Sequence, residues 1–222
     1  MPSRYFPPPS RWSPNGLVAI GGRLTVERLL DAYRNGIFPW PSSAHEPMLW
    51  WSPEPRAILP LDGLHRSQRL RRRMRSGEFS MRVDSAFAAV IAACARGPGR
   101  QGGTWLTPEM IAAYIELHRL GHAHSVETWK QGELVGGVYG VAIGGLFAAE
   151  SMFYRARDAS KAALAGLVDH LNARGYQLLD VQQWTPHTGS LGVMEIPRRE
   201  YLRRLAAVVD LPVVFADKIE TI

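Results

Sequence analysis

Alternating apolar and polar residues dominate the middle of the chain, between residues 123 and 182. The alternation predicts three consecutive strands, over residues 124–129, 133–141 and 146–152. The uncharged stretch from Leu134 to Ala149 is too short for a membrane span, and Gly144-Gly145 within it predicts the turn of a buried hairpin. We therefore expect these strands to form an antiparallel meander.

A helix and a further strand follow this meander. We expect Ser160 to cap a helix over residues 161–173, and Gly175 to close it. The next apolar run predicts a strand over residues 177–182. A strand, a helix and a strand in this order are typical of a parallel pair with a crossover connection, so the sheet is expected to be mixed.

The first sixty residues differ because prolines and aromatic residues divide them into short pieces. One helix is predicted over residues 26–35, with Thr25 as its N-cap and Gly36 after its last turn. We expect residues 1–60 to form a small N-terminal domain that packs against a larger domain of residues 61–222.

Further elements are predicted in the larger domain: a basic helix over residues 65–76, a strand over 79–83, helices over 85–95, 108–120 and 197–209, and a terminal strand over 212–215. Thr107 before Pro108 is typical of a helix start, and Gly121 of its end. The glycine-rich segment 96–103 predicts a mobile loop. This mixed order of helices and strands indicates the α+β class.

Three polar residues stand at the ends of predicted strands. Glu150 ends one apolar run, and Asp180 with Gln182 ends another. Asp180 and Gln182 share a strand face because side chains alternate, and the ends of two parallel neighbours meet at one edge of a sheet. Two carboxylates and an amide without a metal suit proton handling and amine recognition better than redox or phosphoryl chemistry.

Composition indicates a soluble globular protein, with 46% hydrophobic and 21% charged residues. The start of the chain has no apolar core before its prolines, so we expect no signal peptide. The single cysteine, Cys94, excludes an intrachain disulfide framework and fits a reducing cytoplasm. Its apolar neighbours favour core packing over a nucleophile.

The net charge of +6 favours an anionic partner. Six arginines gather in one predicted helical segment: Arg66, Arg69, Arg71, Arg72, Arg73 and Arg75. Arg66, Arg69 and Arg73 share a helical face. The segment is either a solvated helix with an apolar stripe at Leu70 and Met74 or a helix that follows nucleic-acid phosphates.

Short motifs along nearly the whole chain match one family in order and spacing. They are Asn15–Ala19, Gly21-Gly22, Gly36–Trp40, Trp50–Arg56, Gly103–Trp105, Gly121–Glu127, Glu133–Gly137, Glu150–Phe153, Ala159–Lys161, His187–Gly192 and Glu195–Arg198. With these motifs the chain resembles the bacterial leucyl/phenylalanyl-tRNA–protein transferases. The resemblance implies an acetyltransferase-like (GNAT) fold for residues 61–222.

The implied reaction moves leucine or phenylalanine, with methionine as a further candidate, from charged tRNA to the α-amine of proteins that begin with Arg or Lys. The products are expected to enter degradation by the N-end rule in the cytoplasm. Because the aminoacyl ester is already activated, no cofactor and no metal are expected.

The resemblance assigns catalytic roles to Asp180, Gln182 and Glu150. Gln182 would align the attacking amine, with Asp180 polarising its amide, and Glu150 would bind the cationic acceptor or orient Gln182. The proton leaves through Gln182 or through the ribose hydroxyl. The simpler alternative is that Glu150 and Asp180 are strand-end groups paired with Arg155 or Arg157.

The resemblance also indicates substrate-binding residues. Trp50 or Trp51, Trp105 and Tyr114 match aromatic residues near the terminal adenosine, although such tryptophans are as a rule core residues. An apolar pocket for the aminoacyl side chain is expected from Met152, Phe153, Val138 and Leu164. The arginines of residues 66–75 are expected to bind tRNA.

The chain departs from the family after Gln182, where Gln183-Trp184-Thr185-Pro186 replaces an Asn-Asp pattern before His187. Proline removes an amide donor and stiffens this loop, which affects the acceptor side. His122 and His124 share a strand face, but no third spaced ligand in the sequence supports a metal site.

Two other functions remain open from the sequence. A CoA-dependent N-acyltransferase would share the fold, but such enzymes cradle pyrophosphate with glycines at a helix start, where this chain has Arg157–Lys161. A non-catalytic RNA-binding module would bind tRNA without forming a peptide product.

Overall fold

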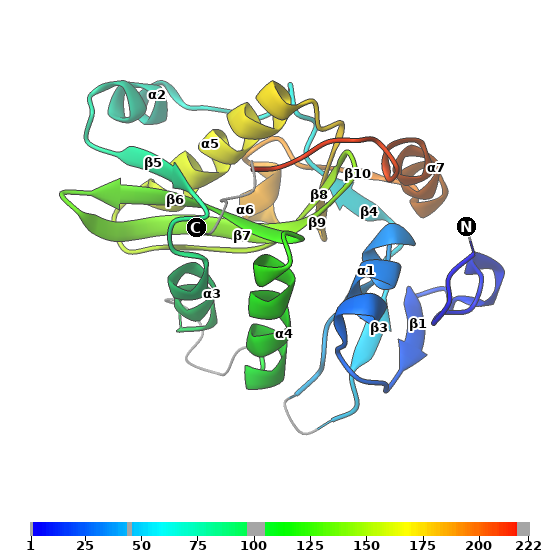
Figure 1. Cartoon of the computed structure of the whole chain (residues 1–222). Coiled ribbons are helices and arrows are strands. Elements are labelled where there is room, and N and C mark those ends of the chain that lie inside the picture. The colour runs from blue at the N-terminus through cyan, green and yellow to red at the C-terminus, as the bar shows by residue number, and fades with distance from the viewer. Residues whose placement is uncertain (1, 44–45, 97–104, 217–222) are drawn as a thin grey trace.

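The computed structural model describes residues 2–43, 46–96 and 105–216. Its main feature is a seven-stranded sheet with helices on both faces (Figure 1). Across the sheet the strands are β10 (Met194–Ile196), β4 (Arg56–Ile58), β9 (Leu178–Gln182), β8 (Leu146–Tyr154), β7 (Glu133–Ile143), β6 (Ala123–Lys130) and β5 (Ser80–Val83). Only β8 and β9 are parallel among these neighbours of the described chain. The α+β class, the meander and the crossover are confirmed.

The helices cover opposite faces of the sheet. α5 (Ala159–Arg174) lies on one face, and α3 (Phe87–Arg96) and α4 (Pro108–Arg119) lie on the other (Figure 1). α5 buries leucines such as Leu164 and Leu167 against Phe147 of the sheet. The larger unit also contains α2 (Gln68–Arg75), α6 (Pro186–Gly189) and α7 (Arg198–Val208), which lie outside these layers.

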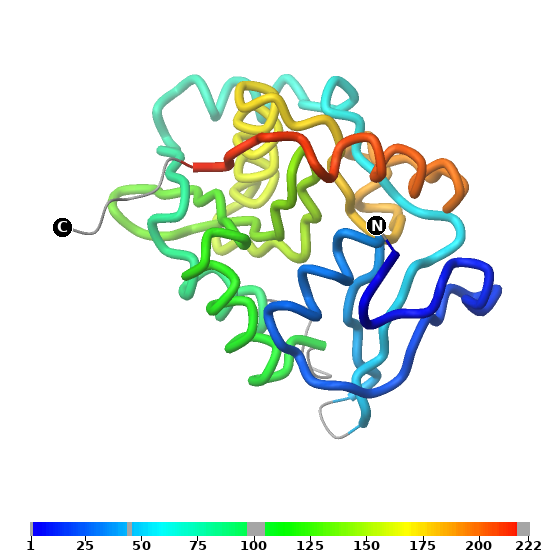
Figure 2. Tube along the Cα trace, turned by 45° about the vertical axis from the view of Figure 1, so that its right-hand side comes forward, coloured from blue at the N-terminus to red at the C-terminus, as the bar shows by residue number. Residues whose placement is uncertain are grey.

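The N-terminal unit is built on a three-stranded sheet of order β1-β3-β2. Its elements are η1 (Pro9–Arg11), β1 (Leu17–Ile20), α1 (Val26–Arg34), β2 (Phe38–Pro39) and β3 (Leu49–Trp51). α1 lies beside α4 of the larger unit (Figure 2). Leu29 and Trp50 belong to the same hydrophobic core as Tyr114 and Tyr139. β4 also precedes residue 61 and yet joins the larger sheet, so the two units share a strand and a core.

Several helix ends form as local sequence predicts. The hydroxyl of Thr25 accepts from Arg28 N, and that of Thr107 accepts from Met110 N. Gly175 ends α5 in the left-handed conformation, at φ +82°. These ends are confirmed because capping depends on only a few neighbouring residues.

Two local expectations are wrong. Asp158, not Ser160, is the N-cap of α5, and Ser160 lies buried inside the first turn. Residues 212–215 form no strand, although the Phe215 ring packs against Phe147 and His124. Most of the expected mobile loop, residues 97–103, lies outside the described residues.

Candidate active site

β8 and β9 separate at their carboxyl ends, and polar side chains lie at this opening. The strands pair only from Leu146 with Leu178 to Ala148 with Asp180. Beyond that point β8 continues beside β7, whereas β9 continues beside β4. Such an end of a parallel pair is where open sheets place ligands.

Glu150 and Gln182 bridge the opening. Gln182 Nε2 donates to Glu150 Oε1 over 2.8 Å, and Gln182 N donates to Asp180 Oδ1 over 3.0 Å. The structure thus brings together all three residues that the sequence singled out. The backbone is irregular at both bridging residues. Gln182 has a left-handed φ of +59°. Glu150 is a β-bulge: its neighbours Ala149 and Ser151 pair with consecutive residues of β7, and Glu150 itself has no partner there. Bulges and left-handed residues recur at functional sites, where they redirect side chains.

Asp180 is held in a buried ion pair with Arg56 of β4. Arg56 Nε and Nη2 donate to its two oxygens over 2.9 and 2.5 Å, and Tyr201 OH donates over 2.9 Å. The side chains of Arg56 and Asp180 are both 1% exposed. Burial is the largest single influence on Arg56 and lowers its pKa, but the charge and hydrogen bond of Asp180, together with Tyr201 and Glu150, raise the pKa above its usual value. Removal of either partner from an ion pair this deeply buried strongly destabilises the folded protein.

These contacts correct two expectations. Asp180 pairs with Arg56 and not with Arg155 or Arg157. Asp180 also contacts only the backbone amide of Gln182, whereas the side-chain amide is held by Glu150. Arg56 was missed because it is distant in sequence, although it ends one of the matching motifs.

Glu150 lies among tyrosine hydroxyls. Tyr114 OH donates to Glu150 Oε2 over 3.1 Å, and Tyr33 OH lies 2.5 Å from Tyr114 OH. Burial is the main cause that raises the pKa of Glu150 to about 7, and the hydroxyls of Tyr33 and Tyr114 and the charge of Arg56 oppose this rise. A carboxyl group with this pKa can exchange a proton near neutral pH.

The tryptophans separate into core and surface. Trp50 is fully buried and donates to Gly21 O, so its ring belongs to the core. Trp51 donates to Trp40 O. Trp105 faces Trp40, with ring centroids 5.8 Å apart, and Trp40 is 37% exposed. Trp40, which the sequence argument passed over within the Gly36–Trp40 motif, therefore forms a partly open aromatic pair with Trp105.

The expected apolar pocket is divided by the sheet. Met152 packs with Val138 and Leu164 on the α5 face, whereas Phe153 packs on the opposite face. Met152 and Phe153 are consecutive residues of a strand and so point to opposite faces. The bulge at Glu150 reverses the alternation of β8, which puts Phe153 rather than Met152 on the face of Glu150. One pocket cannot be lined by all four side chains.

The arginines near α2 fall into two groups. Arg66 pairs with Asp169 at 2.5 Å, Arg69 with Asp158 at 3.4 Å, and Arg73 with Glu78 at 2.6 Å and with Asp158 at 3.2 Å. Within the described chain, no ion pair involves the other three, Arg71, Arg72 and Arg75. These three line a surface hollow of about 520 Å³ with Gln68 and Ser76. The α2 surface is therefore partly neutralised and partly free.

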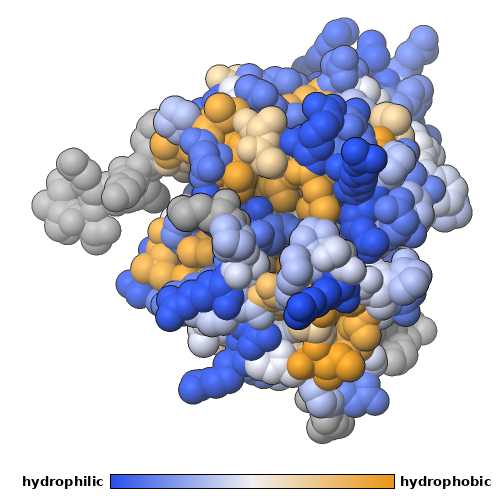
Figure 3. Space-filling view, turned by 90° about the vertical axis from the view of Figure 1, so that its right-hand side faces the viewer, coloured by the Kyte–Doolittle hydropathy of each residue, from blue (hydrophilic) through white to orange (hydrophobic). Residues whose placement is uncertain are grey.

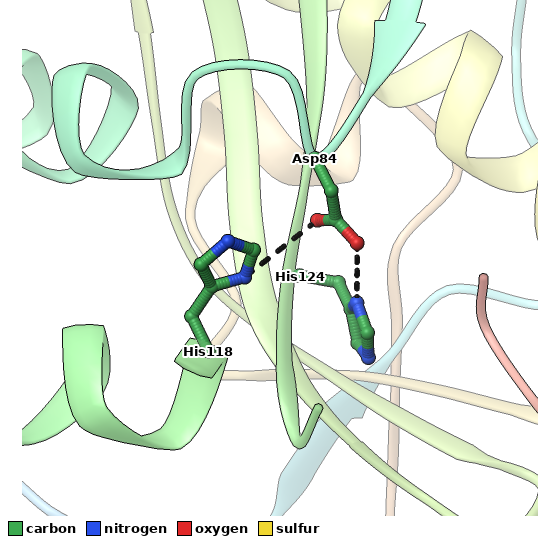
Figure 4. A group of neighbouring side chains, drawn as sticks. All are labelled: Asp84, His118 and His124. Carbon is green, nitrogen blue, oxygen red and sulfur yellow. Dashed lines mark hydrogen bonds and ion pairs between the residues drawn. The ribbon is translucent and has the colours of Figure 1, made fainter. Parts of the chain in front are cut away.

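Asp84, His118 and His124 form a separate cluster whose ligand atoms lie within 4.8 Å of one another (Figure 4). Such a group could hold a metal ion by residue type. Its hydrogen bonds favour a structural role. His118 Nδ1 lies 2.8 Å from Ala123 O, a contact that requires a proton on this nitrogen, and His124 bonds both Asp84 Oδ2 at 2.6 Å and Gly121 O at 3.2 Å.

The outer face of the N-terminal unit and α7 carries separate apolar patches among polar residues (Figure 3). Among the described residues, no helix combines the length and the apolar character that crossing a membrane requires.

Comparisons with known proteins identify the family. The family model for leucyl/phenylalanyl-tRNA protein transferase matches residues 58–206, and the model for its N-terminal domain matches residues 22–54. The leucyl/phenylalanyl-tRNA–protein transferase of Thiobacillus denitrificans is 52% identical over 212 residues, covering 94% of this chain and 92% of the relative. That of Nitratidesulfovibrio vulgaris is 54% identical over 198 residues, covering 89% and 84%.

Solved structures are more distant. L-PGS from Bacillus licheniformis has a TM-score of 0.43 and 15% identity, covering 73% of this chain and 52% of that one. A GCN5-related N-acetyltransferase-like protein from Streptococcus suis has a TM-score of 0.37 and 14% identity, covering 83% and 81%. At these scores the assignment depends on the sequence relatives. The chain belongs to the leucyl/phenylalanyl-tRNA–protein transferase family, whose members are aminoacyltransferases.

Proposed function

We propose that this protein transfers leucine, phenylalanine or methionine from charged tRNA to the α-amine of proteins that begin with Arg or Lys. The transfer would mark these proteins for degradation that depends on the N-terminal residue. The observation that carries the proposal is the Glu150–Gln182 bridge at the open end of β8 and β9, in a chain of this family.

The proposed reaction needs little chemistry beyond positioning. The amine nitrogen bonds to the ester carbonyl carbon and the bond to the ribose oxygen breaks, while the amine loses one proton and the ribose oxygen gains one. Since the ester is already activated, orientation of the amine, which can supply roughly 7–11 kcal/mol, is the main requirement.

The proposed roles follow from the hydrogen bonds. Gln182 donates its amide hydrogen to Glu150, so its carbonyl oxygen is the end available to accept from the acceptor amine. The Glu150 carboxylate would receive the amine proton and return it to the leaving oxygen, a role that its pKa of about 7 supports. The Arg56–Asp180 pair holds β9 and the backbone amide of Gln182.

The aromatic pair of Trp40 and Trp105 supports binding of the terminal adenosine. Stacking of a base on an aromatic ring contributes ~1–3 kcal/mol without reading a sequence. The free arginines 71, 72 and 75 support binding of the tRNA backbone, because exposed guanidinium groups attract phosphates.

The start of α5 disfavours the CoA-dependent alternative. A CoA pyrophosphate would need free backbone amides at this helix start. Asp158 stands at the N-cap instead; its carboxylate makes no cap hydrogen bond, is 6% exposed and pairs with Arg69 and Arg73 of α2. A second anion there would meet a buried negative charge.

The test is transfer of labelled leucine from charged tRNA to a peptide that begins with Arg. We expect a labelled peptide with wild-type protein, little product from a peptide beginning with Ala, and a loss of turnover of about 100-fold or more in Gln182→Ala, the scale of a lost positioning group. Turnover of acetyl-CoA on the same peptide without transfer from tRNA would contradict the proposal. Equal use of Arg- and Ala-initiated peptides would contradict the acceptor assignment.

A further inference from the structure

We propose that Tyr33, on helix α1 of the N-terminal unit, is a positioning residue for this reaction: through Tyr114 it holds the Glu150 carboxylate in its ionised, amine-facing form. The active site is then incomplete without the N-terminal unit. This inference rests on the proposed function, because it concerns the group that receives the amine proton.

A continuous chain of hydrogen bonds joins the two units. Tyr33 OH lies 2.5 Å from Tyr114 OH, Tyr114 OH donates to Glu150 Oε2 over 3.1 Å, and Gln182 Nε2 donates to Glu150 Oε1 over 2.8 Å. These four residues come from α1, α4, β8 and β9. α1 lies directly beside α4, as Figure 2 shows.

The donors and acceptors in this chain of hydrogen bonds can be assigned by counting the hydroxyl protons. A tyrosine hydroxyl has one proton to donate, and that of Tyr114 goes to Glu150. In the Tyr33–Tyr114 contact Tyr33 must therefore be the donor. Tyr33 and Tyr114 are 2% and 0% exposed, so bulk water cannot readily replace a lost hydroxyl. Donors at the end of a buried chain strengthen the bonds that follow.

The donors oppose the effect of burial on Glu150. The pKa of Glu150 is raised to about 7 as the net of opposing influences: burial and, less strongly, the charge of Asp180 of β9 raise it, whereas the hydroxyls of Tyr33 and Tyr114 and the charge of Arg56 lower it. Loss of the Tyr33 hydroxyl removes one lowering influence, so the pKa of Glu150 rises. Since Glu150 acts as a carboxylate, activity is lost as pH falls through its pKa, and the acidic limb moves to higher pH.

The test is the pH profile of kcat/KM for an Arg-initiated peptide in Tyr33→Phe, which keeps the ring and removes the hydroxyl. We expect the acidic limb to move up by about half a unit to one unit, with rates above pH 8.5 within about twofold of wild type. Tyr176→Phe is the matched control: Tyr176 is also buried, but it packs on the α5 face, and its profile should stay unchanged.

A uniform loss of activity at every pH, or an unchanged profile, in a folded Tyr33→Phe protein overturns the inference. If Tyr33→Phe fails to fold, Tyr114→Phe cuts the same chain nearer to Glu150 and must show an equal or larger shift. Neither result affects the proposed function, which fails only if the wild-type protein forms no labelled peptide from charged tRNA.

Discussion

At the scale of single residues, the site depends on charges removed from water. Arg56 and Asp180 satisfy each other so completely that neither offers a free charge to a substrate. Glu150, in contrast, accepts hydrogen bonds from neutral donors alone among the described residues, and this leaves it able to exchange a proton. The carboxyl groups of Asp180 and Glu150 lie near the same opening of the sheet but differ in chemistry, because Asp180 has a cation as its partner and Glu150 does not.

Arg56→Met should destabilise the protein by about 3–5 kcal/mol, because it leaves Asp180 buried without its cation. Arg119→Met is the matched control: the Arg119–Glu116 pair is exposed on both sides, and its loss should leave the stability almost unchanged. Urea unfolding of both variants measures the difference. Similar losses in the two variants would show that the buried pair is not a principal support of β9.

At the scale of elements, the arginines on the two sides of α2 differ in their partners. Arg66, Arg69 and Arg73 are committed to Asp169, Asp158 and Glu78, which ties α2 to α5 and to the loop before β5. The opposite side presents Arg71, Arg72 and Arg75 to the surface hollow. The helical face that the sequence analysis grouped together is therefore the paired one, and the free face is the candidate for phosphates.

Two triple variants with the same change of charge separate these sides. Replacing Arg71, Arg72 and Arg75 by Gln should weaken tRNA binding roughly tenfold and reduce the slope of log K against log salt by about 2 to 3. Replacing Arg66, Arg69 and Arg73 by Gln should change that slope by less, because their charges are already neutralised. Filter binding across a salt series measures both. Equal slopes would contradict the division of α2, and a minimal aminoacyl-adenosine donor should be used equally by all three proteins.

At the scale of the whole molecule, the two units form one body around one core. Leu29 and Trp50 from the N-terminal unit join Tyr114 and Tyr139 in a single hydrophobic cluster, and β4 extends the larger sheet from before the expected boundary. Separation of the two units would therefore expose apolar surface on both of them.

We therefore expect unfolding to be a single cooperative transition. Tryptophan fluorescence, which reports strongly on the N-terminal unit through Trp40, Trp50 and Trp51, should give the same urea midpoint as far-ultraviolet circular dichroism, which follows mainly the helices and the large sheet. Two separated midpoints would contradict the shared core.

Features that depend on neighbouring residues could be read from the sequence. Thr25, Thr107 and Gly175 act within one helical turn, so the helix ends that they define were predicted correctly. Asp158 was not recognised as the cap of α5, because its role depends on a left-handed backbone and on two arginines of α2.

The sequence by itself determined the meander, the crossover helix and the meeting of Glu150, Asp180 and Gln182, because strand alternation and chain order set these, and its short motifs indicated the family. Only the tertiary structure decided the partners: Arg56 on Asp180, Tyr33 behind Glu150, and the bulge that turns Phe153 instead of Met152 toward the site. The physical reason is that side-chain partners and burial come from elements far apart in the chain, and no local pattern records which of them will meet.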